Sequence, residues 1–378
     1  MSAAAVVSPI GAAVAAWRVR RGLSPVELAA RSDLPLEIVD DLEAGRTWVD
    51  QRRVWASLAA ALGVDSGELT GQPFPPTGSE HGEVRAVAHR LRRVLAAVPQ
   101  QSSERAPGLM EERERLLTSA VAADRAGNDH GLAALAPELI CTAERAVREA
   151  RGAARERAVD LRSQGHAVVA GLLRRLGYRD LAWLVLHRAR ATDRQGVEAA
   201  RCLVAEEIRL LLDLGLPEQA LGCAERSGHA RGSVEMSVLA AFAHAVTGRP
   251  DRADIELDAA GSVARNPGSR AAVTAARVTV ALEAADIDAA SGYAALLDLN
   301  ELAPADRVAS LVCLAASAAR GSAFTRAADH LLVAETTAPL RFRLDPFARE
   351  LMVALPPRLA DHDQAEAVRA VARRAGLL

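Results

Sequence analysis

The sequence predicts an all-α protein, and three observations support this prediction. Half of the 378 residues are hydrophobic, but only 3% are aromatic. Alanine, leucine and arginine dominate, and these side chains lose little rotamer freedom in a helix. Long stretches rich in β-branched residues are missing, and from Leu109 onward helical segments alternate with short breaks containing Gly, Pro or Asp. The length leaves room for more than one domain.

The first segment begins with a helix, a turn and a second helix. The first helix ends in the sequence RRG at residues 20–22. Ser24 is a favoured N-cap residue, and Pro25 follows at the first helical position, where the missing proline N–H costs nothing. The second helix carries ELA at residues 27–29, and we expect it to end in a turn at residues 32–34.

A third helix follows this turn. It closes in IVDDLEAG at residues 38–45, where Gly45 suits the left-handed conformation that follows a helix end. LAAALGV at residues 58–64 forms a trailing helix. These segments resemble the Xre/Cro-type helix-turn-helix of phage repressors and bacterial regulators, through the combined spacing of Arg18, Gly22, Leu28, Ala29, Leu42, Glu43 and Gly45. The resemblance implies a five-helix DNA-binding bundle over residues 1–71.

The resemblance also implies roles for residues around the third helix. Glu43 would pair with Arg18 inside the domain. Leu36 and Glu37 would take the leading base-facing positions, where Leu36 can touch a thymine methyl. Asp41 would lie near the bases, where a carboxylate can accept from cytosine N4 but repels phosphate.

The charge balance of residues 1–71 is unusual for a DNA-binding domain, because seven arginines stand against nine acids. The phosphate anchor that the family usually places at the start of the second helix is replaced by Pro25. Most DNA affinity comes from counterion release, so the arginines must be concentrated around the reading helix. The resemblance places there Arg20, Arg21, Arg31, Arg46, Arg52 and Arg53, with Thr47 and Trp48 as further phosphate donors. The alternative is a helix-turn-helix that has become a protein-docking module.

Residues 72–108 are predicted to connect two domains. TGQPFPPTGSEHG at residues 70–82 is too rich in Pro and Gly to continue a helix. EVRAVAHRLRRVLAAV at residues 83–98 then has helical periodicity, and PQQSSERAPG at residues 99–108 breaks the chain again. We therefore assign residues 72–108 to a linker with a connecting helix, and residues 109–378 to a separate domain.

Alanines recur in this last domain at intervals of 33 to 38 residues: Ala182, Ala220, Ala253, Ala290 and Ala327. Twelve residues upstream stand Ala170, Ile208, Ala241, Val278 and Ala315, and seven residues downstream stand Ala189, Ser227, Ala260, Leu297 and Ala334. Such a period is typical of stacked helical hairpins. It resembles the tetratricopeptide repeat, and residues 109–150 are expected to form a degenerate capping hairpin. The alternative is an alanine-rich bundle with accidental spacing.

Motifs for catalysis or metal binding are missing from the sequence. Without lysine there can be no P-loop, and GxGxxG after a strand, GxSxG and HExxH do not occur. The four cysteines and nine histidines are scattered. We therefore expect no cofactor, no metal and no enzymatic activity. The absence of a basic leader and of an apolar run near the roughly 20 residues that span a bilayer predicts a cytoplasmic protein without membrane contact.

A helix-turn-helix followed by hairpin repeats resembles bacterial regulators whose repeats dimerise and sense a peptide or small molecule. The repeat register places Arg174, Arg209, Glu235 and Phe242 on the concave, ligand-binding surface. We expect a homodimeric transcriptional regulator that binds a double-stranded DNA operator, with a repeat domain for dimerisation, for sensing a peptide or small-molecule effector, or for both. The lack of lysine suits a GC-rich, actinobacterial genome. The alternative is an interaction adaptor whose helix-turn-helix does not bind DNA.

Overall fold

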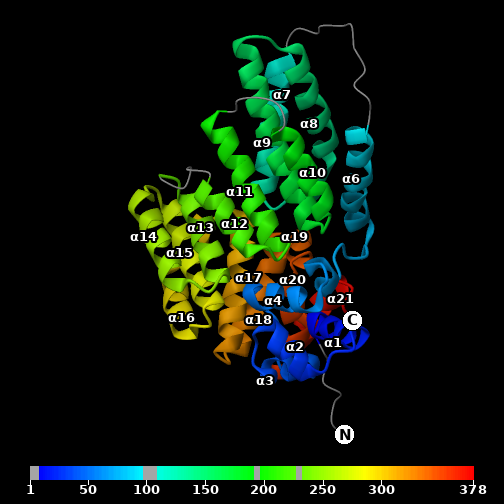
Figure 1. Cartoon of the computed structure of the whole chain (residues 1–378), viewed down its shortest axis with the longest axis vertical. Coiled ribbons are helices and arrows are strands. Elements are labelled where there is room, and N and C mark those ends of the chain that lie inside the picture. The colour runs from blue at the N-terminus through cyan, green and yellow to red at the C-terminus, as the bar shows by residue number, and fades with distance from the viewer. Residues whose placement is uncertain (1–7, 97–108, 191–195, 227–231) are drawn as a thin grey trace. The chain divides into compact units, whose positions relative to one another are not determined.

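The structure is a computed structural model that describes residues 8–96, 109–190, 196–226 and 232–378. Over these ranges the chain is helical and contains no β-strand, which confirms the predicted all-α class (Figure 1). The contacts group the residues into two compact units, one formed by residues up to 75 together with 211–378, and the other by residues 76–210. The predicted domain boundaries at residues 71 and 108 stay predictions, since the compact units follow contacts and not sequence motifs.

The first unit begins with a five-helix bundle, called here the head: α1 (Pro9–Arg20), α2 (Pro25–Ser32), α3 (Leu36–Glu43), α4 (Arg52–Leu62) and α5 (Ser66–Thr70). Local chemistry fixes its helix ends. Ser24 and Glu27 form a reciprocal capping box at the start of α2, with Pro25 in the first turn. Asp33 ends α2 in the left-handed conformation with φ of 54°, and Gly45 has φ of 69° in the turn that follows α3.

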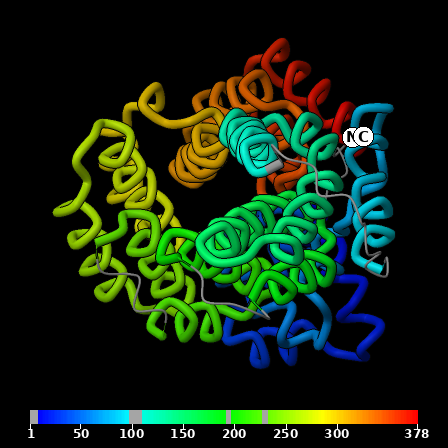
Figure 2. The backbone as a smooth tube through the Cα atoms, turned by 90° about the horizontal axis from the view of Figure 1, so that it is seen from above, coloured from blue at the N-terminus to red at the C-terminus, as the bar shows by residue number. Residues whose placement is uncertain are grey.

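The first unit continues with hairpins and a C-terminal group of helices. The elements are α12 (Pro217–Arg226), α13 (Val234–Val246), α14 (Pro250–Val263), α15 (Pro267–Glu283), α16 (Ile287–Leu296), α17 (Pro304–Arg320), α18 (Phe324–Thr337), α19 (Pro339–Arg343), α20 (Pro346–Ala354) and α21 (His362–Arg374), with short 3-10 turns at Leu299–Glu301 and Pro356–Arg358. The hairpins from α13 to α18 lie side by side in chain order, as the yellow-green to orange segments of Figure 2 show.

The second unit contains α6 (Ser79–Ala96), α7 (Leu109–Arg125), α8 (Asp129–Glu149), α9 (Ala153–Arg175), α10 (Arg179–Arg190) and most of α11 (Val197–Asp213). The connecting helix predicted at residues 83–98 begins earlier, at Ser79, and residues 97–98 lie outside the described ranges. The predicted hairpin at residues 109–150 is formed by α7 and α8, with its break at residues 126–128.

Burial of the recurring small residues confirms the hairpin repeats. The five alanines of the register lie on α10, α12, α14, α16 and α18, and each is fully buried at 0% exposure. Their upstream partners on α9, α11, α13, α15 and α17 are at most 1% exposed. Small buried residues let the two helices of a hairpin approach closely. Downstream, Leu297 is only half-buried, and Ser227 lies outside the described residues.

The head shares one hydrophobic core with the C-terminal helices of the first unit, α15 to α21. The largest buried side chains of this core include Trp55 of the head and Phe342 of α19. Trp55 also contacts Phe347 of α20 edge to face, with ring centroids 5.9 Å apart and an interplanar angle of 86°. The head is therefore an integral part of the first unit and not an independently packed domain.

Candidate nucleic-acid interface

The helix-turn-helix geometry is held by one ion pair, between Arg18 of α1 and Glu43 at the end of α3. Arg18 Nε and Nη2 donate to the two carboxylate oxygens of Glu43 at 2.6 and 2.7 Å, and Arg18 Nη1 donates to the Leu23 carbonyl at 2.8 Å. Both side chains are 15% exposed. The hydrogen bonds that Arg18 donates to Glu43 raise the pKa of Arg18 above its usual value. The pairing predicted from the resemblance is confirmed, and it fixes α3 against α1.

The tight turn between α2 and α3 is made by backbone geometry and a buried hydroxyl. Asp33 takes the left-handed conformation, and the Leu34 N–H reaches back to the Ala29 carbonyl at 3.1 Å. Ser32 is buried and its hydroxyl donates to the Leu28 carbonyl at 2.8 Å. These bonds end α2 within one turn and set the angle at which α3 departs.

The two sides of α3 differ in burial. Val39 and Leu42 point into the core, whereas Leu36 is 38% exposed and Glu37 and Asp40 are exposed. The outward side is therefore accessible and acidic, as the sequence predicts for this helix.

An ion pair offsets part of the acidity beside α3. Arg46 Nε donates to Asp41 Oδ1 at 2.6 Å, and the two side chains are 60% and 41% exposed. Arg31 is exposed on the neighbouring α2. Leu36, Glu37, Asp41, Arg31 and Arg46 thus all remain on the surface of the head, next to or on α3.

Arg52, at the start of α4, is mostly covered by residues of the first unit that lie outside the head. Its guanidinium lies 5.2 Å from the ring centroids of both Phe242 and Phe347, and its Nη2 donates to Asp213 Oδ1 at 3.2 Å. Only 26% of the side chain is exposed. A guanidinium placed between two aromatic faces and a carboxylate is strongly held. Arg52 is therefore a packing residue of the unit, and the expectation that it contacts phosphate does not fit this position.

The loop between α3 and α4 is held by arginines from the C-terminal helices. Arg320 of α17 donates to both carboxylate oxygens of Asp50 at 2.9 Å, to the Trp48 carbonyl at 2.8 Å and to Thr47 Oγ1 at 3.1 Å. Arg358 donates to the Arg46 carbonyl at 2.6 Å. The Thr47 hydroxyl oxygen consequently already accepts a hydrogen bond from within the first unit.

Trp48 is likewise not placed as a phosphate donor. Its side chain is buried, and its indole N–H donates to Asp50 Oδ2 at 2.8 Å. The indole N–H of Trp48 is therefore already bound within the loop. The Thr47 hydroxyl oxygen accepts from Arg320, which holds Thr47 against the C-terminal helices. Arg53 keeps an exposed side chain.

Two buried glutamates join the head to the C-terminal helices, and sequence reasoning missed this role. Glu350 of α20 accepts from the Ile10 N–H at 2.8 Å and the Val49 N–H at 3.2 Å. Glu283, the last residue of α15, accepts from the Arg52 N–H at 2.8 Å and the Arg53 N–H at 3.2 Å. We call Glu283 and Glu350 the anchoring carboxylates. They satisfy the N–H groups of Ile10, Arg52 and Arg53 at the first turns of α1 and α4, which have no partner within their own helices, and the N–H of Val49 in the α3–α4 loop.

Burial dominates the electrostatics of the anchoring carboxylates. Loss of hydration raises the pKa of Glu283 to about 7 and that of Glu350 to about 7, although the backbone N–H donors oppose this shift. Glu350 is 0% exposed and follows Arg349 within an otherwise apolar turn of α20. A carboxylate in an apolar helical turn is the one sequence signal that points to such a buried acceptor.

The four expected ligand-binding residues fall into different units. Arg174 and Arg209, in the second unit, both contact Glu206, at 2.6 and 3.6 Å. Glu235 and Phe242 lie on α13 in the first unit, where Phe242 stacks with Arg52. A common concave site for these residues stays a prediction.

The described ranges are residues 8–96, 109–190, 196–226 and 232–378. Over these residues no group of three or more His, Cys, Asp and Glu side chains could hold a metal ion. None of the described helices combines the length and the apolar character needed to cross a bilayer.

The similarity of the chain to known proteins is weak. No protein-family model matches the chain, and no curated protein matches it in sequence. Among solved structures, the chain is similar to PlcR of Bacillus thuringiensis, crystallised in complex with the peptide PapR7 and DNA. The sequences are 11% identical, the match covers 76% of this chain and 95% of that chain, and the TM-score is 0.35. A similarity of this size transfers no residue role to the chain.

Proposed function

We propose that the chain is a DNA-binding transcriptional regulator of the Xre/Cro type, in which α3 enters the major groove. One observation carries the proposal: the Arg18–Glu43 pair fixes α3 against α1 while its outward side, with Leu36 and Glu37, stays accessible. A recognition helix needs both a rigid support and a free face. The head supplies both.

The proposed contacts divide into base-facing and phosphate-facing groups. Leu36, Glu37 and Asp41 face the bases, and Arg31 and Arg46 lie beside the phosphates. Arg46 exchanges its exposed bond with Asp41 for a phosphate oxygen, which releases the Asp41 carboxylate to accept from cytosine N4. We leave Arg52 and Thr47 out of this set, because each already has an internal partner.

The quaternary part of the proposal follows from the family resemblance. A homodimer would read two half-sites about 34 Å apart, one helical turn of DNA. Its effector would bind the hairpin repeats, with Arg174, Arg209, Glu235 and Phe242 as the first residues to vary. The protein would act in the cytoplasm on chromosomal DNA.

The proposal is tested by fluorescence anisotropy with the full chain and a set of genomic promoter fragments, first at low salt and then at increasing salt. Arg31→Gln and Arg46→Gln should each weaken binding and reduce the salt slope by about one. Arg265→Gln is the matched control, because Arg265 is exposed on the loop before α15, away from the head motif. Absence of binding to any fragment at low salt would refute the proposal.

A protein-docking function is the second candidate, and the acidic outward side of α3 favours it. Glu37 and Asp40 are exposed and repel phosphate, whereas they would attract a basic protein surface. A pull-down from nuclease-treated extract separates the two functions. Docking requires a partner that is retained without DNA and lost with Glu37→Gln and Asp40→Asn, while Arg31→Gln has no effect.

A further inference from the structure

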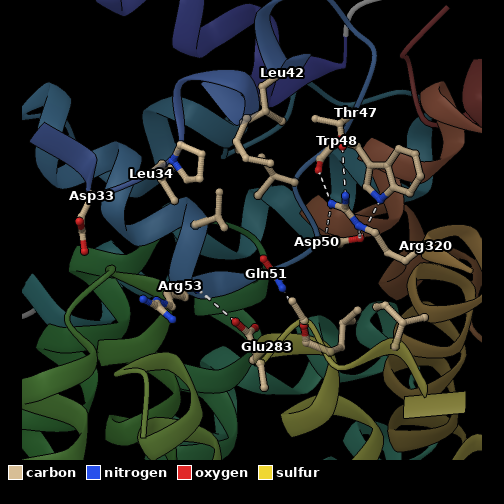
Figure 3. Close-up of a pocket in the computed structure, with 18 residues that line it drawn as sticks. Asp33, Leu34, Leu42, Thr47, Trp48, Asp50, Gln51, Arg53, Glu283 and Arg320 are labelled. Carbon is tan, nitrogen blue, oxygen red and sulfur yellow. Dashed lines mark hydrogen bonds and ion pairs between the residues drawn. The ribbon is translucent and has the colours of Figure 1, made fainter. Parts of the chain in front are cut away.

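A cavity of about 370 Å³ lies within the first unit, between the head and the C-terminal helices (Figure 3). Its walls come from the α2–α3 turn, the inner side of α3, the loop at residues 47–51, the α15–α16 connection and Arg320 of α17. The volume falls within the roughly 300–1,000 Å³ that is usual for small-molecule sites. The chain leaves this space unfilled beside its candidate recognition helix.

The centre of the cavity is apolar. Leu34, Ile38 and Leu42 line it from the head, and Leu282 and Ile287 line it from α15 and α16. Such a lining excludes water from an apolar body that enters it, and burial of that body contributes roughly 25 cal/mol per Å². The walls therefore suit a ligand whose main part is a hydrocarbon or an aromatic ring.

Most polar groups of the lining already have partners. The Asp50 carboxylate is held by Arg320, and both oxygens of Glu283 accept backbone N–H bonds. The Arg53 guanidinium differs, since no hydrogen bond or ion pair joins it to another described residue. Its side chain is exposed and lies beside Glu283 in Figure 3. A guanidinium without a partner at the edge of an apolar cavity suits an anionic group.

Asp33 is a lining residue whose negative charge would repel an anionic ligand. In Figure 3, however, its carboxylate lies at the outer edge of the lining residues, far from the apolar centre. Its short side chain stays at the rim, whereas the Arg53 side chain is long enough to follow a ligand.

We propose that this cavity binds a small molecule with an apolar body and one anionic group, the body resting on Leu34, Ile38 and Ile287 and the anion pairing with Arg53. The site is distinct from the concave residues of the hairpin repeats. One consequence rests on the proposed function: a ligand body resting on Leu34 and Ile38 touches the α2–α3 turn and the inner side of α3, so saturating ligand should change DNA affinity. Binding itself requires no DNA, so the two proposals can fail separately.

The test uses the full chain and two fluorescent probes with the same aromatic skeleton, anilinonaphthalene sulfonate and its uncharged analogue N-phenylnaphthylamine. Both become brighter in an apolar site. We expect saturable binding at one site, with the sulfonate bound more tightly. Arg53→Gln should weaken sulfonate binding about tenfold, the loss of one charge-assisted bond, and leave the analogue unchanged.

Three further variants make the result decisive. Asp33→Asn removes the repelling carboxylate and should tighten sulfonate binding. Ala284→Trp fills the cavity from an exposed lining position and should abolish binding of both probes. Arg265→Gln, outside the cavity, should change neither affinity. Equal binding of both probes to the wild-type, Arg53→Gln and Ala284→Trp proteins, each with an unchanged thermal melt, would overturn the proposal.

Discussion

At the scale of single residues, the anchoring carboxylates show how a buried charge can join two parts of a chain. Each accepts two backbone N–H groups: Glu283 from the start of α4, and Glu350 from the start of α1 and from the α3–α4 loop. Each therefore satisfies donors that would otherwise lack a partner. The same burial makes the ionised form costly, and this raises the pKa of both carboxyls to about 7. The free energy with which these two carboxyls hold the head to the C-terminal helices therefore depends on pH.

The direction of this linkage can be predicted. Burial raises the pKa of Glu283 and Glu350 from 4.5 to about 7, so between these values the folded state binds more protons than the unfolded state. Their contribution to the free energy of unfolding is therefore full at low pH and is lost as pH rises through the folded pKa. We expect roughly 1–3 kcal/mol per carboxyl between about pH 5 and about pH 8.

Urea unfolding at several pH values measures this effect. Glu283→Gln and Glu350→Gln should lower stability at every pH, because the amide nitrogen faces a backbone N–H, but each should reduce the fall in stability above about pH 5. Glu301→Gln, at an exposed position, is the matched control. Identical pH slopes for all four proteins would show that the anchoring carboxylates do not titrate in this range.

The acids of α3 allow a second residue-scale prediction, which rests on the proposed function. Asp40 is exposed, and a carboxylate there repels phosphate whatever the DNA sequence. Asp40→Asn should therefore strengthen binding to random-sequence DNA more than binding to a selected operator. Parallel anisotropy titrations give the ratio of the two affinities, and an unchanged ratio would mean that Asp40 does not act in discrimination.

At the scale of elements, the sequence predicted what local chemistry determines. Ser24, Pro25 and Gly45 mark helix ends through caps and backbone conformation, and the structure places the ends there. The alanine register predicted which helices pair, because an alanine at each of the five central positions lets the paired helix approach closely. These signals lie within about 40 residues of one another, the length of one hairpin repeat.

The partners of the α3–α4 loop could not be predicted in this way. Arg52 occupies a family phosphate position, and no local pattern announces that Phe242 and Phe347 will enclose it. Thr47 and Trp48 resemble surface donors until Arg320, more than 270 residues away, contacts them. The difference has one cause: the sequence prediction treated the head as a free domain, whereas the C-terminal helices cover one side of it.

Close approach of α1 and α3 supports a prediction about two glycines. A Cβ at Gly11 would overlap the Leu42 carbonyl oxygen and lie 3.0 Å from Ser8 Oγ, while a Cβ at Gly292 in α16 would meet nothing within 4 Å. Gly11→Ala should therefore destabilise the protein by about 1–3 kcal/mol through overpacking. Gly292→Ala should stabilise it by about 0.5–1 kcal/mol, because alanine favours the helix.

Chemical denaturation of the two glycine variants under one set of conditions measures whether Gly11→Ala lowers, and Gly292→Ala raises, the free energy of unfolding. The pair is matched in chemistry and differs only in the space around the glycine. Equal effects of the two substitutions would mean that α1 can move away from α3, and that the ion pair between Arg18 and Glu43 does not hold them in register.

At the scale of the whole molecule, the shared core predicts cooperative behaviour of the first unit. The head and the C-terminal helices bury one continuous set of side chains, from Ile10 to Ala375. Amide hydrogen exchange should therefore give similar opening free energies for α1–α5 and for α17–α20. Glu350→Gln should lower both sets together. Faster exchange confined to α1–α5 would show that the head opens independently.

The bond from Ile10 to Glu350 also has a consequence for biosynthesis. These residues are 340 positions apart, and ribosomes add about 5–20 residues per second, so the N-terminal helices wait roughly 17–70 s for their acceptor. During that time the apolar surface that will meet α20 is open to chaperones, to proteases and to neighbouring nascent chains. A chain stalled before α20 is translated would thus carry a complete set of head helices without the Glu350 carboxylate that accepts from Ile10.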